Sequence, residues 1–203
     1  MTPKLIIVTS MVLILGCAPQ ADQAKVAPQS EPAETAPKAD QAKEASQSDQ
    51  VEIALTDKLD STTNNYCLDI AGGNKNIDIT KGLQGHTCYS YRGSLGADQV
   101  FDPGRFAQGE LYMPNFKVCA TLSALQADAK VGLAPCDSSE LQQFAFKGEG
   151  TITPKAAPDM CLTLATATRT GRSKQHQIKA LQLVACDSQQ SKYQTWRART
   201  SMD

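Results

Sequence analysis

The sequence predicts an all-β fold built from three copies of one unit, which fill the chain from about residue 51 to residue 199. Each copy has an opening cysteine behind a short strand pattern, a second cysteine behind another apolar run, and a closing glutamine near an aromatic residue. The copies run from Cys67 to Phe101, from Cys119 to Phe144 and from Cys161 to Trp196. Self-similarity with a period of about 40–50 residues is typical of repeat architectures.

The order of these landmarks resembles the ricin B-chain family of β-trefoil lectins over roughly residues 51–199. One Gln-x-aromatic triplet would carry no weight, but three of them, each behind a pair of cysteines, are a specific signal. The resemblance implies a β-trefoil with repeats at about residues 51–105, 106–147 and 148–199. It also implies that the closing aromatic residue is buried in the core, where Phe replaces the usual Trp in two copies.

Residues 1–17 predict a bacterial lipoprotein signal peptide. Lys4 precedes an apolar run from Leu5 to Leu15, which is too short to cross a bilayer as a helix. The run ends in Gly16-Cys17, which resembles the lipobox, so we expect a lipid with fatty acyl chains such as palmitate on Cys17; an ordinary signal peptide is the alternative. Because Ala18 follows rather than Asp, the resemblance implies an outer-membrane lipoprotein of the bacterial cell envelope.

Residues 18–50 predict a low-complexity, disordered linker. They contain small, polar and charged residues with one Val and no aromatic residue, so they cannot bury enough apolar surface to offset the loss of chain entropy. Residues 18–25 recur almost unchanged as residues 36–43. This duplication indicates a tether that grew by repetition, and a binding repeat for peptidoglycan or a partner is the alternative.

The cysteines predict three disulfide bonds. The chain has seven, and if Cys17 carries the lipid, the other six fall two per repeat, which in an exported protein favours disulfides. The repeat and the family resemblance both select pairing within each copy, and each bridge contributes about 3 kcal/mol in the chain-entropy model. The spacings do not suit zinc. The expected pairs are Cys67–Cys88, Cys119–Cys136 and Cys161–Cys186.

Composition and motifs argue against several functions. The net charge is −1, so no overall positive field attracts nucleic acid. The sequence has no phosphate-binding loop, no Gly-x-Ser-x-Gly elbow and no His-Glu-x-x-His motif. We therefore expect no enzyme activity, no cofactor and no metal ion.

The resemblance implies a sugar pocket in each repeat, and only the first copy keeps the residues for it. In the family, a carboxylate two residues after the first cysteine accepts sugar hydroxyls, an aromatic residue two before the second cysteine stacks on the sugar, and a polar pair ends at the closing Gln. The second copy has Thr121 and Ala134 at the first two positions, and the third has Thr163 and Val184. The expected carbohydrate-binding residues are Asp69, Gln84, His86, Asp98 and Gln99.

Two alternatives stay open at this point. Asp69 could merely cap a turn, with His86 an ordinary surface histidine. A basic insert in the third copy could attract sulfated or phosphorylated glycans, although a solvated loop is its commoner explanation. The basic residues of this insert are Arg169, Arg172, Lys174, His176 and Lys179.

The sequence therefore favours a lipid-anchored lectin that binds carbohydrate without catalysis, mainly through one pocket in the first repeat. Its expected partners are a glycan or polysaccharide, and the membrane through its anchor. The alternative is a protein-interaction subunit of a surface or toxin-like complex, because a fold alone does not fix a function.

Overall fold

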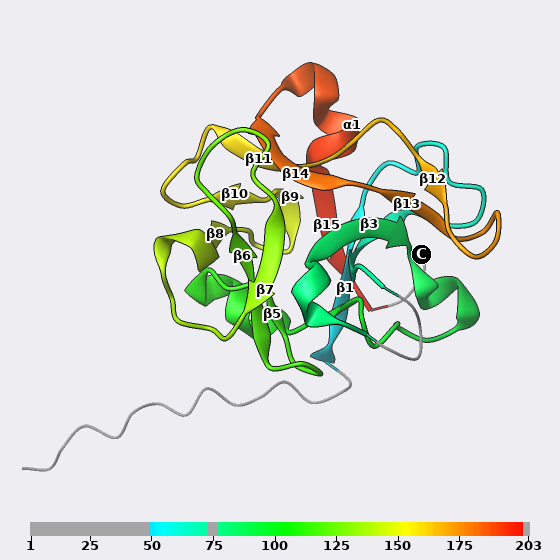
Figure 1. Ribbon diagram of the computed structural model, residues 1–203, viewed down its shortest axis with the longest axis horizontal. Helices are drawn as coiled ribbons and strands as arrows, with labels where there is room; N and C mark the ends of the chain where they lie inside the picture. Colours follow the sequence, from blue (N-terminus) through cyan, green and yellow to red (C-terminus); the bar gives the residue numbers. More distant parts are fainter. Residues whose placement is uncertain (1–48, 73–76, 201–203) are drawn as a thin grey trace, which may run out of the picture. The chain divides into compact units, whose positions relative to one another are not determined.

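The computed structural model describes residues 49–72 and 77–200 (Figure 1). The predicted signal peptide with Cys17, and residues 18–48 of the predicted linker, lie outside the described residues. The first strand, β1, begins at Val51, next to the predicted end of the linker. In the described part of the chain, no helix is long and apolar enough to cross a membrane.

The described chain consists of short strands joined by turns, 3-10 helices and one helical turn. The first repeat contains β1 (Val51–Leu55), β2 (Tyr66–Ile70), η2 (Ile79–Lys81), β3 (Leu83–Thr87), η3 (Tyr89–Arg92) and β4 (Val100–Phe101). The second contains η4 (Pro103–Gln108), β5 (Tyr112–Met113), β6 (Val118–Leu122), β7 (Val131–Ala134), η5 (Glu140–Gln142) and β8 (Phe144–Ala145). The third contains β9 (Glu149–Thr151), β10 (Thr153–Pro154), β11 (Met160–Leu164), β14 (Leu181–Ala185), η6 (Ser188–Gln190), α1 (Ser191–Gln194) and β15 (Thr195–Arg199). An additional hairpin, β12 (Arg169–Thr170) and β13 (Gln177–Lys179), is inserted between β11 and β14.

The outer strands of the repeats join the repeats to one another. Strand β1 pairs antiparallel with β4 of its own repeat and with β15 of the third repeat, and β8 pairs with β10 across the second and third repeats. The amide of Asp102 donates to the carbonyl of Tyr112 at 3.0 Å, which links the first and second repeats. The middle strands form the hairpins β2–β3, β6–β7 and β11–β14. This is the arrangement of a β-trefoil, and the predicted all-β fold of three repeats is confirmed.

The closing aromatic residue of each repeat is buried in the core, as expected. Phe101, Phe144 and Trp196 are each at most 1% exposed. The indole N–H of Trp196 donates to the carbonyl of Leu162 at 3.0 Å, so the one polar group of this side chain is satisfied. Phe in the first two repeats therefore fills the same core position as Trp in the third.

All three predicted disulfides are present. They join Cys67 to Cys88, Cys119 to Cys136 and Cys161 to Cys186, with Cα–Cα distances of 4.9, 5.1 and 5.0 Å. Each bridge ties the first strand of a middle hairpin to a residue one or two positions beyond its second strand. The pairing within repeats is therefore confirmed.

The closing glutamine holds the end of this hairpin in every repeat. In the second repeat, the Nε2 of Gln142 donates to Thr121 Oγ1 at 3.0 Å and to the Pro135 carbonyl at 2.9 Å. Its Oε1 accepts the backbone N–H of Asp137 at 2.8 Å. One buried side chain thus satisfies a strand hydroxyl and the backbone on both sides of the second cysteine.

The other two repeats reproduce this pattern. In the third repeat, Gln194 contacts Thr163 Oγ1, the Ala185 carbonyl and the Asp187 N–H at 3.0, 3.0 and 2.9 Å. In the first repeat, Gln99 contacts Asp69 Oδ2, the Thr87 carbonyl and the Tyr89 N–H at 3.0, 3.3 and 2.8 Å. The three glutamines are at most 1% exposed. The repeats differ at one point of the pattern, where Asp69 replaces a threonine.

Replacing Gln194 by Ala should lower the free energy of unfolding by about 3 kcal/mol, since three hydrogen bonds of about 1 kcal/mol each are lost. For a domain of this size, that loss lowers the melting temperature by roughly 6–12 °C. Thermal unfolding followed by circular dichroism measures it. The exposed Gln189 provides the matched control, and its change to Ala should leave the melting temperature almost unchanged. Equal melting temperatures for the two variants would refute the structural role of the closing glutamine.

Candidate functional site

The first repeat brings its five expected site residues together around the β2–β3 hairpin. Asp69 on β2 lies opposite Gln84 on β3, and the Nε2 of Gln84 donates to Asp69 Oδ1 at 2.9 Å. Gln99 donates to the other carboxylate oxygen at 3.0 Å. His86 lies two residues further along β3, and Asp98 directly precedes Gln99.

Asp69 lies beneath the surface. Only 2% of its area is exposed, and each of its oxygens accepts an amide N–H. Burial raises the pKa of this carboxyl well above its usual value, and the charge of Asp98 raises it further. Asp69 lies in strand β2 and accepts hydrogen bonds from the side chains of Gln84 and Gln99. The interpretation of Asp69 as a turn cap is therefore wrong.

His86 is also buried, with 5% of its area exposed, and it belongs to a cluster of three rings. Its ring centroid lies 5.1 Å from that of Tyr89 and 5.4 Å from that of His176. The ring Nδ1 lies 2.8 Å from the Thr87 carbonyl, which can only accept, so this nitrogen carries the proton. The interpretation of His86 as a surface histidine is therefore wrong.

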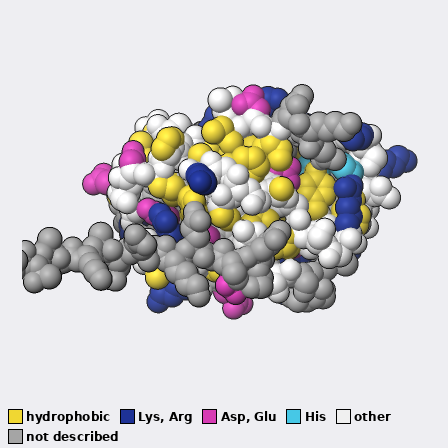
Figure 2. All heavy atoms as spheres, turned by 90° about the horizontal axis from the view of Figure 1, so that it is seen from below, with side chains coloured by type: hydrophobic (Ala, Val, Ile, Leu, Met, Phe, Trp, Pro, Cys, Tyr) yellow, Lys and Arg dark blue, Asp and Glu magenta, His cyan; other side chains and the backbone are white. Residues whose placement is uncertain are grey.

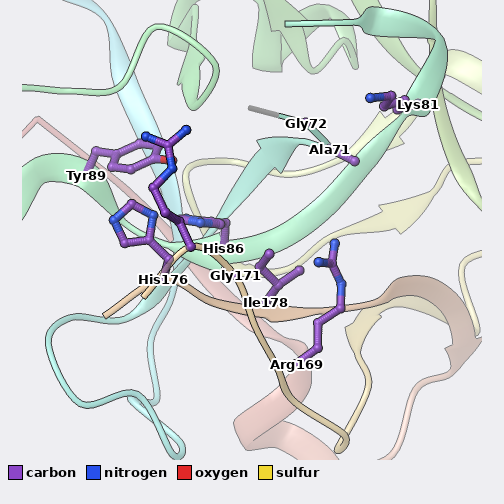
Figure 3. A pocket seen from close by; sticks show the side chains of 10 residues that line it. Ala71, Gly72, Lys81, His86, Tyr89, Arg169, Gly171, His176 and Ile178 are labelled. Carbon is purple, nitrogen blue, oxygen red and sulfur yellow. The ribbon is translucent and has the colours of Figure 1, made fainter. Parts of the chain in front are cut away.

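These rings form one side of a pocket of about 320 Å³, which is at the small end of the range for ligand sites. Figure 3 shows Tyr89, His86 and His176 together on one side, with Arg169 and Lys81 away from them. The residues that line the pocket are Ala71, Gly72, Lys81, His86, Tyr89, Arg169, Gly171, Arg172, His176 and Ile178.

The second wall of the pocket comes from the basic insert of the third repeat. Strand β13 pairs antiparallel with β3, with Ile178 opposite His86, and β12 continues the sheet outward (Figure 1). The insert is thus a hairpin that extends the sheet of the first repeat rather than an irregular loop, while Arg169, Arg172 and Lys174 on it remain exposed. The site is made of two segments about 90 residues apart in the chain.

Lys179 fixes the base of this hairpin. Its side chain is 1% exposed and its Nζ lies 3.1 Å from Asp60 Oδ1. The same nitrogen donates to the Thr166 carbonyl at 2.8 Å and to Thr168 Oγ1 at 2.6 Å, and it lies 5.3 Å from the centre of the Tyr66 ring. Lys179 is therefore a structural residue, unlike the other basic residues of the insert.

Arg169 connects the insert to the buried carboxylate. Its Nη2 donates to Gln84 Oε1 at 3.0 Å, and Gln84 in turn donates to Asp69. Because the amide of Gln84 is held on both sides, the guanidinium of Arg169 is oriented at the edge of the pocket. Asp69 thus acts on the pocket through Gln84.

On the aromatic side, Arg92 orients His176. The Arg92 Nη2 lies 3.0 Å from His176 Nε2, and since arginine can only donate, this imidazole nitrogen accepts. The Arg92 guanidinium also lies 5.1 Å from the centre of the Tyr89 ring. Burial and the charge of Arg92 lower the pKa of His176, and burial, with the charges of Arg169 and Arg92, lowers that of His86. Both rings are therefore mainly neutral near pH 7.

The pocket lies in a positively charged part of the surface. Figure 2 shows histidine at one end of the face, with Lys or Arg side chains around it and hydrophobic atoms beside it. His86 and His176 are the only histidines of the chain, and both line the pocket. Three cations, Lys81, Arg169 and Arg172, line the pocket, and none of the lining residues is acidic.

Two further hollows, of about 380 and 220 Å³, adjoin the pocket. One shares Arg169 and Ile178 with it and is also lined by Gln84. The other shares Tyr89 and is also lined by Asp98. Of the five expected residues, His86 lines the pocket, Gln84 and Asp98 line the adjoining hollows, and Asp69 and Gln99 lie behind them. The sequence offered no signal that Lys81 would join the insert at this place.

The corresponding positions of the other repeats lack these groups. Ala134 and Val184 occupy the strand position of His86, since each lies opposite the first cysteine of its hairpin as His86 does. The larger hollow of about 810 Å³ elsewhere in the domain is mainly apolar, with Phe106, Phe144 and Phe146 in its walls.

Comparison with known proteins confirms the family resemblance. Residues 107–203 match the family model described as the ricin-type beta-trefoil lectin domain, which covers the second and third repeats. No curated protein resembles the chain closely enough to count as a relative. The chain therefore contains a ricin B-like β-trefoil lectin domain.

Two solved structures are distantly similar. The designed threefold-symmetric protein ThreeFoil has 15% identity and a TM-score of 0.46, over 76% of this chain and 98% of its own. The β-trefoil lectin of the Vibrio vulnificus hemolysin/cytolysin, solved with N-acetyl-D-lactosamine bound, has 14% identity and a TM-score of 0.45, over 76% of this chain and 96% of its own.

Replacing Asp69 by Thr, the residue of the other two repeats, should change how stability depends on pH. Burial raises the folded-state pKa of Asp69 above the unfolded value of 3.8, so the buried carboxyl lowers stability as pH rises from 3.8 through its folded pKa. The stability of the variant relative to the native chain should therefore increase as the pH rises above 3.8 through the folded-state pKa of Asp69. Urea unfolding across this range measures the difference.

The exposed Asp159 supplies the control, since Asp159→Asn should show no such trend. A stability difference between Asp69→Thr and the native chain that stays constant with pH would show that the Asp69 carboxyl is not perturbed by burial.

Proposed function

We propose that this chain is a non-catalytic carbohydrate-binding protein and that the sugar occupies the pocket between β3 and the insert. The observation that carries the proposal is the aromatic and cationic pocket at the sugar position of the first repeat, in a chain with a ricin-type lectin domain. The other two repeats have Ala134 and Val184 where this pocket has His86. We therefore expect one site per chain.

The pocket supplies the two kinds of contact that a sugar needs. The Tyr89 and His86 rings line the pocket, and we assign them to contact with the C–H face of a sugar ring. Lys81, Arg169 and Arg172 provide N–H donors for its oxygens. Because Asp69 is 2% exposed, we assign it to positioning Gln84 and Arg169 rather than to contact with the sugar.

We also propose that the domain is attached to the bacterial cell envelope, as an outer-membrane lipoprotein, through a lipid on Cys17. The supporting feature is the apolar run that ends in Gly16-Cys17. Two or three acyl chains at one residue would hold the chain firmly, since a single chain gives only marginal binding. The linker that follows would separate the domain from the lipid surface.

Replacing His86 by Ala should weaken binding of any glycan identified on an array by roughly 3- to 10-fold, because an aromatic contact contributes about 0.5–1.5 kcal/mol beyond its area. Isothermal titration calorimetry measures this, and the native chain should show a stoichiometry near one. Val184→Ala, the change at the equivalent position of the third repeat, should leave the affinity unaltered. A stoichiometry of two or three would place sugar sites in the other repeats.

The same array separates the proposed lectin from the alternative, a protein-interaction subunit of a surface or toxin-like complex. Reproducible glycan hits support the lectin. An array without hits, together with a protein that co-purifies with the chain, supports the subunit.

The anchor is tested by expressing the full chain in a Gram-negative host. The native chain should partition into the detergent phase, whereas Cys17→Ala should lack the lipid and remain in the aqueous phase. Mass spectrometry of the mature N-terminus decides the outcome. A mature chain that begins at any residue other than Cys17 would contradict the lipid anchor.

A further inference from the structure

The charge of the pocket has no counter-ion among its own lining residues. Lys81, Arg169 and Arg172 bring three positive charges to a pocket of about 320 Å³ without a lining carboxylate. Within the described residues, neither Lys81 nor Arg172 forms a hydrogen bond or an ion pair through its side chain. Like charges gathered in a partly enclosed space repel one another, and a bound anion relieves this repulsion.

We propose that the ligand of this pocket is an acidic saccharide, one that carries a carboxylate, sulfate or phosphate group. This inference rests on the proposed function and names the class of sugar that the same pocket accepts. The acidic group lies against the guanidinium of Arg169, with Lys81 and Arg172 as the other cations that line the pocket, and the sugar ring lies against Tyr89 and His86.

Of the three cations, Arg169 is the one whose side chain is held in place for binding an anion. Its Nη2 is held by Gln84 Oε1 at 3.0 Å, which leaves its other N–H groups available. A planar guanidinium fits carboxylate, sulfate and phosphate oxygens with two parallel hydrogen bonds. Its partner Gln84 is neutral, so the charge of Arg169 is not cancelled by the residue that orients it.

The shape of the pocket distinguishes an acidic sugar from a simple anion. The rings of His86, Tyr89 and His176 lie within 6.1 Å of one another, and Arg169 and Lys81 lie apart from them in Figure 3. A bare sulfate or phosphate would use only the cationic side. A sugar ring with an acidic substituent uses both sides.

The adjoining hollows allow this ligand to be longer than one sugar. One shares Arg169 with the pocket and the other shares Tyr89, so a saccharide chain could continue in either direction. The hollow beyond Tyr89 also contains Arg92, whereas Asp98 in its wall is only 8% exposed. Positive charge therefore continues along this surface.

The test is a glycan array made of pairs that share a backbone and differ only by a carboxylate, sulfate or phosphate group, probed with the purified full chain. Acidic members should bind at least about 10-fold more tightly than their neutral partners, since charge-assisted hydrogen bonds are lost in the neutral form. Added salt should weaken the acidic hits. Calorimetry on the best pair then gives both affinities.

Two variants of the insert assign the effect to the pocket. Arg172→Gln should weaken binding of the acidic sugar of the pair by roughly 10-fold or more and should change binding of the neutral sugar little. Lys174→Gln removes the same charge two residues away, from an exposed side chain that does not line the pocket, and should change neither. Lys81→Gln provides a second pocket variant from a different segment.

The outcomes separate this inference from the proposed function. Equal binding of acidic and neutral partners would overturn the inference and leave the lectin proposal intact. The inference would also be overturned if Arg172→Gln and Lys174→Gln lost the same affinity for the acidic sugar. Competition by inorganic sulfate at the same concentration as the acidic sugar would overturn it as well. If no glycan binds, acidic or neutral, both the inference and the proposed carbohydrate-binding function are overturned.

Discussion

The buried glutamine at the end of each repeat is the interaction on which the rest of the structure depends. It joins a strand residue to the backbone on both sides of the second cysteine, and it lies two residues before the core aromatic residue. The disulfide, the hairpin and the core aromatic residue are therefore positioned together. Polar groups in this environment are costly to leave unpaired, so the three repeats keep the same set of hydrogen bonds.

The first repeat uses this structural feature to support a surface site. Its strand residue is Asp69 rather than a threonine, and the second carboxylate oxygen engages Gln84, which orients Arg169. The hydrogen bond between the closing glutamine and the strand residue, which all three repeats share, is in this way connected through Gln84 to the pocket. The same glutamine, Gln99, holds the backbone of Tyr89, one of the rings of the pocket. The stability of the hairpin and the geometry of the pocket are therefore linked in this repeat.

The third repeat completes the site. Strand β13 of its insert pairs with the edge of β3 in the first repeat. The insert thereby covers this strand edge and contributes Arg169 and Arg172 to the lining of the pocket. Lys179 and Asp60 fix the base of the hairpin, and the exposed basic residues lie further along it. Among the described residues, the first repeat differs from the other two at this place through the insert and through His86, where they have Ala134 and Val184.

The sequence predicted the fold well because its signals are local and occur three times. The cysteine pairs, the closing glutamines and the core aromatic residues each recur with the same spacing, and the three bridges follow from them. The five expected residues of the first repeat also lie together, as their common hairpin required.

The wall of the pocket and the burial of Asp69 could not be predicted in this way. The wall depends on β13 pairing with β3, a contact between segments about 90 residues apart, and no local pattern specifies which strand edge an insert will join. Strand alternation places Asp69 on the same face as Cys67 but does not show that Gln84 and Gln99 will cover its oxygens. Lys81 was missed for the same reason, because only the folded chain brings it to the same pocket as the insert.

The central claim is that two distant segments, residues 81–92 and residues 169–179, form one binding site. Hydrogen–deuterium exchange of the full chain, with and without its best glycan, tests this most directly, because it reports both segments in one measurement. Binding should slow exchange in both segments together and leave the β6–β7 and β11–β14 hairpins unchanged. Protection of only one of the two segments, or protection around Phe106, Phe144 and Phe146 instead, would contradict the account.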